Sequence, residues 1–107
     1  MPAPEITGVL REVRNGLAEI YGSRLSGCYL YGSHARGEAR SGSDVDILIV
    51  LEDYTSYSQE LARTSQLIES LSLRYNAALS RVFLRRAEWL SGDNPFLENV
   101  REEAVPA

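Results

Sequence analysis

Apolar residues recur along this chain with two different periods, which predict helices alternating with strands. From Pro4 to Tyr21 they repeat at helical spacing, and Gly22 is expected to end this first helix. Shorter apolar runs follow at Leu25–Tyr31 and Val45–Leu51, and their length is typical of strands. The second run is apolar on both faces, which predicts a strand at the centre of a sheet.

The second half of the chain continues this alternation and predicts the fold class. A polar connection precedes a second long helix, and a strand and two helical segments follow. The expected bounds are 52–56 for the connection, Tyr57–Tyr75 for the helix, 77–84 for the strand, 88–90 for a helical turn and 95–103 for the last helix, which has a proline in its first turn. This order predicts an α/β (α+β) domain over residues 1–107, with a small mixed β-sheet flanked by helices.

The segment between the first two strands carries most of the candidate chemistry. Gly32 and Ser33 follow the first strand and predict a turn into a short helix, whose free backbone amides would favour an anion such as phosphate. Ten residues separate Ser33 from Asp44, and Asp46 follows two positions later. Along a strand these two carboxylates share one face, where they repel each other unless a cation lies between them. A phosphate cradle beside a Mg²⁺ site is what nucleotidyl transfer requires.

Gly32-Ser33, ten residues and Asp44-Val45-Asp46 together resemble the signature of the DNA polymerase beta nucleotidyltransferase superfamily. The residues from Ser33 to Arg40 and from Ser43 to Leu48 resemble its minimal nucleotidyltransferase (MNT) branch. Many members of this branch are the antitoxins of HEPN–MNT toxin–antitoxin pairs. The resemblance implies a polymerase-beta-like nucleotidyltransferase fold. It also implies one or two Mg²⁺ ions, ATP or another nucleoside triphosphate as substrate, and transfer of AMP to a hydroxyl group on a HEPN-type partner protein.

The same resemblance implies roles for individual residues. Asp44 and Asp46 would be the catalytic residues and metal ligands, and Gly32 and Ser33 would hold the triphosphate. The other residues expected to bind nucleotide are Arg36, Arg40 and Ser43. For Arg36 and Arg40, solvated loop charges are an equally good interpretation, although arginine suits phosphate recognition. His34, the single histidine, is expected to be a loop residue rather than a catalytic base.

One part of the family pattern is missing. Family members normally carry a third carboxylate on the strand after the long helix, but residues 77–84 contain no Asp or Glu, and Ser80 or Arg81 stands in its place. Arg81, if it pointed into the site, would bind a phosphate or neutralise the two aspartates. A substitute acid elsewhere in the chain is a further possibility, with four candidates: Glu88, Glu98, Glu102 and Glu103. The alternative function is therefore a catalytically weak or inactive protein of this fold that neutralises a toxin by binding it.

Composition narrows the remaining classes of function. The net charge of −4 argues against a broad nucleic-acid surface, which needs a basic patch. All 11 basic residues are arginines, so a catalytic lysine is excluded. An enzyme acting on RNA ends is therefore the least favoured class. No apolar run is long enough to span a membrane, and the N-terminal residues lack a signal-peptide pattern, so a cytoplasmic location is expected. Cys28 is the single cysteine and is expected to pack in the core.

Overall fold

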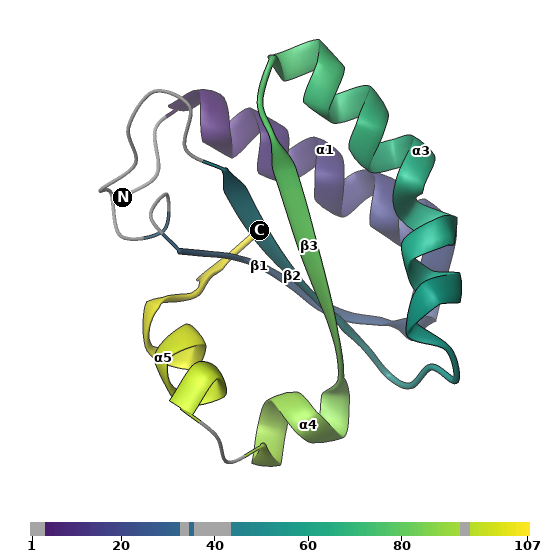
Figure 1. The fold of residues 1–107 in the computed structure, drawn as a ribbon, viewed down its shortest axis with the longest axis vertical. Helices are drawn as coiled ribbons and strands as arrows, with labels where there is room; N and C mark the ends of the chain where they lie inside the picture. The colour runs from purple at the N-terminus through teal and green to yellow at the C-terminus, as the bar shows by residue number, and fades with distance from the viewer. Residues whose placement is uncertain (1–3, 33–34, 36–43, 93–94) are drawn as a thin grey trace.

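Helices and strands alternate along the chain nearly as the pattern predicts (Figure 1). The computed structural model describes residues 4–32, 35, 44–92 and 95–107. The elements in these residues are α1 (Pro4–Tyr21), the 3-10 helix η1 (Gly22–Arg24), β1 (Leu25–Tyr31), β2 (Val45–Leu51), α3 (Tyr57–Tyr75), β3 (Leu79–Arg85), α4 (Arg86–Ser91), α5 (Pro95–Glu103) and β4 (Val105–Pro106). The predicted bounds of α1, β1, β2, α3 and α5 are confirmed.

Three details of the second half differ from the prediction. β3 begins at Leu79 and ends at Arg85, so it is shifted towards the C-terminus. The expected helical turn is a six-residue helix, α4, whose first turn is capped by Glu88. The two-residue strand β4 was not predicted, because so short a segment has no periodicity to recognise.

The strands form a mixed sheet with the order β3-β2-β1-β4. β2 runs antiparallel to β1 and parallel to β3, and β4 pairs antiparallel with β1. The parallel pair requires a crossover connection, which α3 supplies. β2 lies between β1 and β3, so the prediction of a central strand is confirmed.

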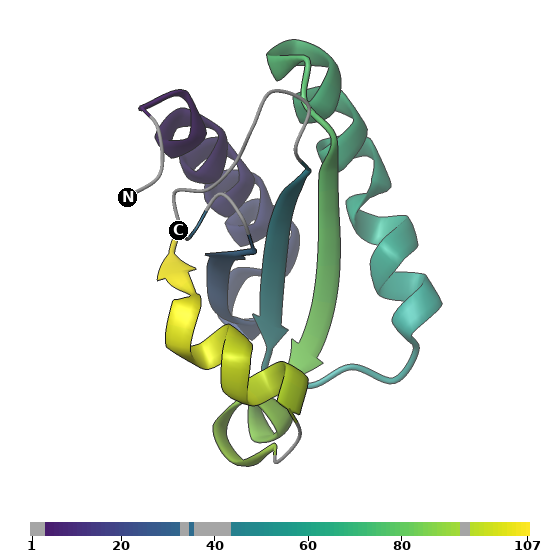
Figure 2. The same cartoon turned by 60° about the vertical axis from the view of Figure 1, so that its left-hand side comes forward.

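The two faces of the sheet are covered by different helices (Figure 2). Ile47, Ile49 and Leu51 of β2 belong to the main core, which α1 and α3 cover. Leu48 and Val50 point to the opposite face, as the two-residue period of a strand requires, and pack in a smaller cluster with residues of α4 and α5. Asp46 has the same parity as Leu48, so it belongs to this second face.

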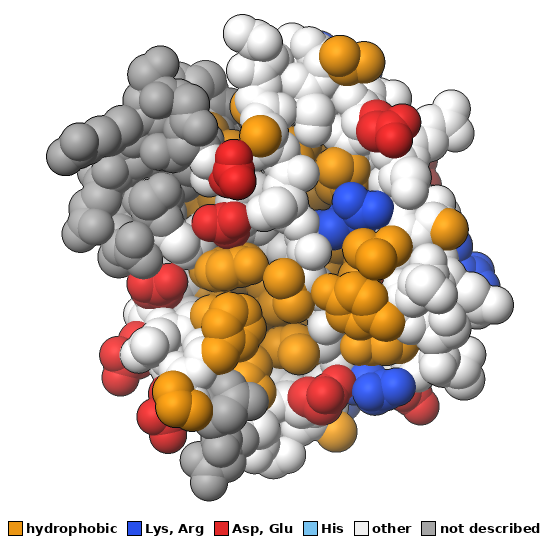
Figure 3. Space-filling view, in the orientation of Figure 1, with side chains coloured by type: hydrophobic (Ala, Val, Ile, Leu, Met, Phe, Trp, Pro, Cys, Tyr) orange, Lys and Arg blue, Asp and Glu red, His pale blue; other side chains and the backbone are white. Residues whose placement is uncertain are grey.

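The second face is less fully covered than the first. In the space-filling view, apolar side chains gather over the sheet between α4 and α5, with acidic side chains next to them (Figure 3). Val82 and Leu84 of β3 are among the apolar residues that remain partly exposed there. This face of the sheet is therefore the more exposed of the two.

A buried carboxylate joins α1 to α3 on the first face. Glu60 is 2% exposed and accepts a hydrogen bond of 2.8 Å from the hydroxyl of Tyr21. Burial, and then the hydrogen bond to Glu60, raises the pKa of Tyr21, so this phenol stays protonated at neutral pH. Arg63 approaches the same carboxylate at 3.5 Å.

Cys28 is buried in this core, as expected. Among the helices of the described residues, none combines the length and apolar content needed to cross a lipid bilayer.

Candidate functional site

Asp46 lies near the start of the central strand, on the face that α4 and α5 cover. It pairs with Tyr31 of β1 on one side and with Ser80 of β3 on the other. Its Oδ1 accepts a hydrogen bond of 2.8 Å from the hydroxyl of Ser80. This bond fixes one carboxylate oxygen and leaves Oδ2 turned towards the end of β1.

Gly32, directly after β1, meets that second oxygen. Its φ angle is +78°, a region that side-chain-bearing residues rarely adopt. A Cβ added at Gly32 would lie 2.4 Å from Oδ2 of Asp46, which is closer than any real contact. Glycine is therefore required here by both the backbone conformation and the close approach of the carboxylate.

The aromatic residues of β1 complete this part of the face. Tyr31 contacts Phe96 edge-on, with ring centroids 6.1 Å apart, and Tyr29 stacks at a tilt on Trp89 at 4.9 Å. Both tyrosines therefore pack against helices, Tyr29 against α4 and Tyr31 against α5. Burial, and then the charge of Asp46, raises the pKa of Tyr31, so its hydroxyl stays neutral beside the carboxylate at physiological pH.

The other residues expected in the site are only partly described. Asp44 lies one residue before β2 and is exposed. Ala35 is buried in the main core. The remaining expected residues lie outside the described residues: Ser33, His34, Arg36, Arg40 and Ser43.

Ser80, and not Arg81, occupies the position where the third carboxylate is expected. Adjacent residues of a strand point to opposite faces, and Ser80 shares the face of Asp46. Arg81 points the other way: its Nε donates to Oγ1 of Thr64 and its Nη2 to the carbonyl of Leu61, both at 2.7 Å. The idea that Arg81 binds a phosphate or neutralises the aspartates is therefore wrong, because its guanidinium is used in packing β3 against α3.

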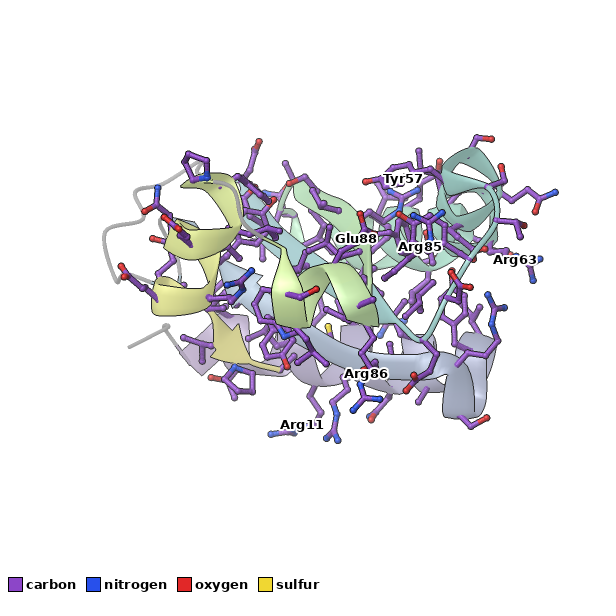
Figure 4. The ribbon with its side chains drawn as sticks, turned by 90° about the horizontal axis from the view of Figure 1, so that it is seen from below. Arg11, Tyr57, Arg63, Arg85, Arg86 and Glu88 are labelled. Atoms are coloured by element: carbon purple, nitrogen blue, oxygen red, sulfur yellow. The ribbon has the colours of Figure 1, made fainter. Side chains whose placement is uncertain are left out.

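Among the four candidate substitute acids, Glu103 is the one that contacts Gly32 within the described part of the chain. Its Oε1 accepts a hydrogen bond of 3.2 Å from the backbone N–H of Gly32. Glu88 lies beyond the opposite end of β3, where it accepts from the backbone N–H of Arg85 at 3.0 Å and pairs with its guanidinium (Figure 4). Glu98 and Glu102 are exposed on α5.

Sequence reasoning gave no reason to prefer Glu103, because the contact depends on β4. The antiparallel register pairs Leu30 with Val105. Two residues further in each direction come Gly32 and Glu103. Only the pairing of this short C-terminal strand brings the end of α5 to the end of β1.

The oxygen donors on this face suit a hard divalent cation. Asp46 Oδ2 lies beside Gly32, which has no side chain of its own to cover this oxygen. Carboxylate oxygens are what Mg²⁺ prefers, and Mg²⁺ commonly uses one or two protein carboxylates together with substrate phosphates and water. Among the described residues, no three His, Cys, Asp or Glu side chains are grouped as metal ligands. Among the described residues, Asp46 thus offers one carboxylate of the kind that Mg²⁺ binds, next to the Gly32 corner.

Comparison with known proteins agrees with this arrangement. A family model described as "Nucleotidyltransferase domain" matches residues 10–102. The protein adenylyltransferase MntA of Thermococcus cleftensis is 35% identical over 75 residues, which cover 70% of this chain and 74% of that protein. The solved structure of a protein named as a minimal nucleotidyltransferase superimposes with a TM-score of 0.66 at 26% identity, covering 100% of this chain and 97% of the other.

Two solved toxin–antitoxin complexes share the fold. One contains AMP-PNP and matches with a TM-score of 0.66 at 18% identity, covering 91% of this chain and 70% of the other. The second is a tri-AMPylated Shewanella oneidensis HEPN toxin in complex with an MNT antitoxin; it matches with a TM-score of 0.51 at 16% identity and the same two coverages, 91% and 70%. With the match of the family model over most of its length, this chain belongs to the nucleotidyltransferase domain family, in its minimal nucleotidyltransferase branch.

Proposed function

We propose that this protein is a Mg²⁺-dependent nucleotidyltransferase that transfers AMP from ATP to a hydroxyl group on a protein partner. In this proposal residues 1–107 act as one domain in the cytoplasm, and the partner is a HEPN-type toxin that the protein neutralises. Support comes from family membership, from the relative named as a protein adenylyltransferase, and from the toxin–antitoxin complexes of the same fold.

The observation that carries the proposal is the contact between Asp46 and Gly32. A carboxylate oxygen at the start of the central strand faces a glycine corner that no side chain can fill. A cation bound by the carboxylate would thus lie next to the backbone amides of the corner. Triphosphate oxygens would bind to both the cation and the amides. A hydrogen bond from the Ser80 hydroxyl holds the carboxylate in place.

Each residue has a role in this proposal. Asp44 and Asp46 hold the metal, and Gly32 and Ser33 bind the triphosphate through their amides and the serine hydroxyl. Arg36 and Arg40 contact phosphate oxygens, and Ser43 orients Asp44. Bound Mg²⁺ would neutralise phosphate charge and lower the pKa of the acceptor hydroxyl.

The reaction is a single displacement at the α-phosphorus. The acceptor hydroxyl oxygen forms a bond to this phosphorus, the bond to the β-phosphate oxygen breaks, and pyrophosphate leaves. The hydroxyl proton passes to solvent. The protein's contribution is to hold the triphosphate and the acceptor in line and to offset the charge that develops.

A transfer assay tests the proposal directly. The protein is incubated with Mg²⁺, labelled ATP and the HEPN-type product of a neighbouring gene, and label on the partner is measured. We expect transfer by the natural protein and a loss of more than about 100-fold in the Asp44→Ala/Asp46→Ala variant. Asp53→Ala, which removes an exposed carboxylate remote from Gly32, is the matched control and should retain activity. Transfer that survives the double substitution would exclude both aspartates from the mechanism.

A second candidate is favoured by one observation, the serine at position 80. Without a third acid, the protein would bind nucleotide weakly and neutralise its partner by occlusion. Tight partner binding that is unchanged in Asp44→Asn, together with no detectable transfer, would support this function over the first.

A further inference from the structure

A carboxylate of the protein itself lies on the amide of Gly32. Glu103 Oε1 accepts the hydrogen bond of this N–H at 3.2 Å. The contact joins residues 71 positions apart in sequence, and Glu103 is half-buried rather than free in solvent. The amide at the end of β1 is therefore already used by an anion.

Nothing in the helix itself explains an acid at this position. Glu103 is the last residue of α5, and a carboxylate at a helix C-terminus faces the negative end of the helix dipole. It also lies close to the corner that Asp46 Oδ2 approaches, so two negative charges converge on Gly32. The hydrogen bond to Gly32 offsets part of this unfavourable electrostatic energy.

The contact also has a definite structural origin. β4 pairs with β1 so that Val105 lies opposite Leu30, and extending this register brings Glu103 opposite Gly32. The backbone of the chain after α5 thus holds the Glu103 side chain at the corner.

We propose that Glu103 competes with the triphosphate for the Gly32 amide and so sets the affinity of the site for nucleotide. This inference rests on the proposed function, in which Gly32 contacts the triphosphate. A backbone amide has one hydrogen to donate, and a carboxylate and a phosphate oxygen are alternative anionic acceptors for it. Nucleotide binding must then break the bond to Glu103 and move its charge away from the incoming phosphates.

Titration calorimetry with ATP and Mg²⁺ tests this competition. Glu103→Gln keeps an acceptor but loses the charge, and Glu103→Ala removes the acceptor as well. We expect roughly three- to tenfold tighter binding in these variants, with Ala at least as tight as Gln. Glu102→Gln, which neutralises the exposed neighbour on the same helix, is the matched control and should bind like the natural protein. In the transfer assay, KM for ATP should fall while kcat is unchanged.

Inorganic tripolyphosphate without metal provides a second measurement that does not depend on catalysis. In ¹⁵N-labelled protein the Gly32 amide resonance should shift on its addition, and should do so at lower concentrations in Glu103→Gln.

The possible results separate this inference from the proposed function. Equal nucleotide affinity in the natural protein and both Glu103 variants would overturn the competition and leave the transferase proposal intact. Weaker binding in the variants would also overturn it, because it would show that Glu103 supports nucleotide binding. Failure of all these proteins to bind nucleotide would overturn both proposals.

Discussion

Ser80 determines the environment of Asp46 more directly than any other described residue. Its hydroxyl donates to Oδ1 at 2.8 Å from the neighbouring parallel strand, in the position where related enzymes are expected to carry an acid. This neutral donor restricts the rotation of the Asp46 carboxylate but adds no charge to hold a cation. The Asp46 carboxylate is thus held in place, but position 80 supplies no third carboxylate.

Replacement of Ser80 by Asp should restore that ligand. We expect Ser80→Asp to bind Mg²⁺ at least about tenfold more tightly in the presence of nucleotide and to raise the rate of transfer. Without metal, the new charge beside Asp46 should lower the free energy of unfolding by up to about 1 kcal/mol. Calorimetry and urea denaturation measure these two effects.

Ser80→Asn is the matched control, because it has similar size to Asp but no charge. If Asn and Asp at this position gave the same Mg²⁺ dependence, charge at position 80 would not matter. The natural protein would then hold its metal without any ligand from β3.

At the scale of elements, the two faces of β3 make different contacts: one face contacts Asp46 and the other contacts α3. Ser80 faces the site, while the next residue, Arg81, crosses to α3 and bonds Thr64 and the carbonyl of Leu61. Thr64 is fully buried, so the guanidinium satisfies polar atoms that water does not reach. Arg81 therefore fixes the crossover helix to the strand that carries Ser80.

Arg81→Ala should accordingly reduce stability without removing nucleotide contacts. We expect the free energy of unfolding to fall by about 1.5–3 kcal/mol, since two hydrogen bonds from a charged donor are lost and the buried Thr64 hydroxyl keeps only the backbone carbonyls to which it donates. The affinity for ATP with Mg²⁺ should stay within about twofold of the natural value at a temperature where the variant is folded.

Thr64→Val removes the hydroxyl that accepts the hydrogen bond from Arg81 and should show a smaller loss of stability. A large fall in nucleotide affinity in Arg81→Ala, with little change in stability, would contradict the assignment of Arg81 to packing.

For the whole molecule, the two faces of the sheet differ in how much apolar surface they bury. The face under α1 and α3 holds most of the buried apolar residues, including Cys28, whereas the face under α4 and α5 holds Asp46. Burial raises the pKa of the Cys28 thiol to about 12, because an apolar environment disfavours the thiolate. The first face thus makes stability depend on pH in the alkaline range.

The sign follows from proton binding. Above about pH 8.5 the unfolded chain loses the thiol proton while the folded chain keeps it, so stability falls as pH rises, by about 1 kcal/mol between pH 8.5 and 9.5. Urea denaturation under reducing conditions at these two pH values measures the change. Cys28→Ala should be less stable at both values but should show a smaller difference between them. An unchanged difference would mean that the thiol is not protected by the fold.

Local patterns in the sequence were enough to predict most of the fold. Helical spacing over Pro4–Tyr21 and Tyr57–Tyr75, and the apolar run of β2, reflect burial periods that each segment carries by itself. The motif from Gly32 to Asp46 likewise predicted the family, because its glycine and the aspartates at the start of β2 lie within one short stretch of sequence and can be recognised by their spacing. That Asp46 lies against Gly32 agrees with this expectation, while the roles of Asp44, Ser33, Arg36, Arg40 and Ser43 stay predictions.

Contacts between distant segments were decided only by the tertiary structure. Whether Ser80 or Arg81 faces Asp46 depends on the register of β3 against β2, and a shift by one residue would exchange them. The arrival of Glu103 at Gly32 depends on a two-residue strand that leaves no pattern in the sequence. The physical reason is the same in both cases: periodicity shows which residues of one segment share a face, but only the packing of segments against one another determines what that face meets.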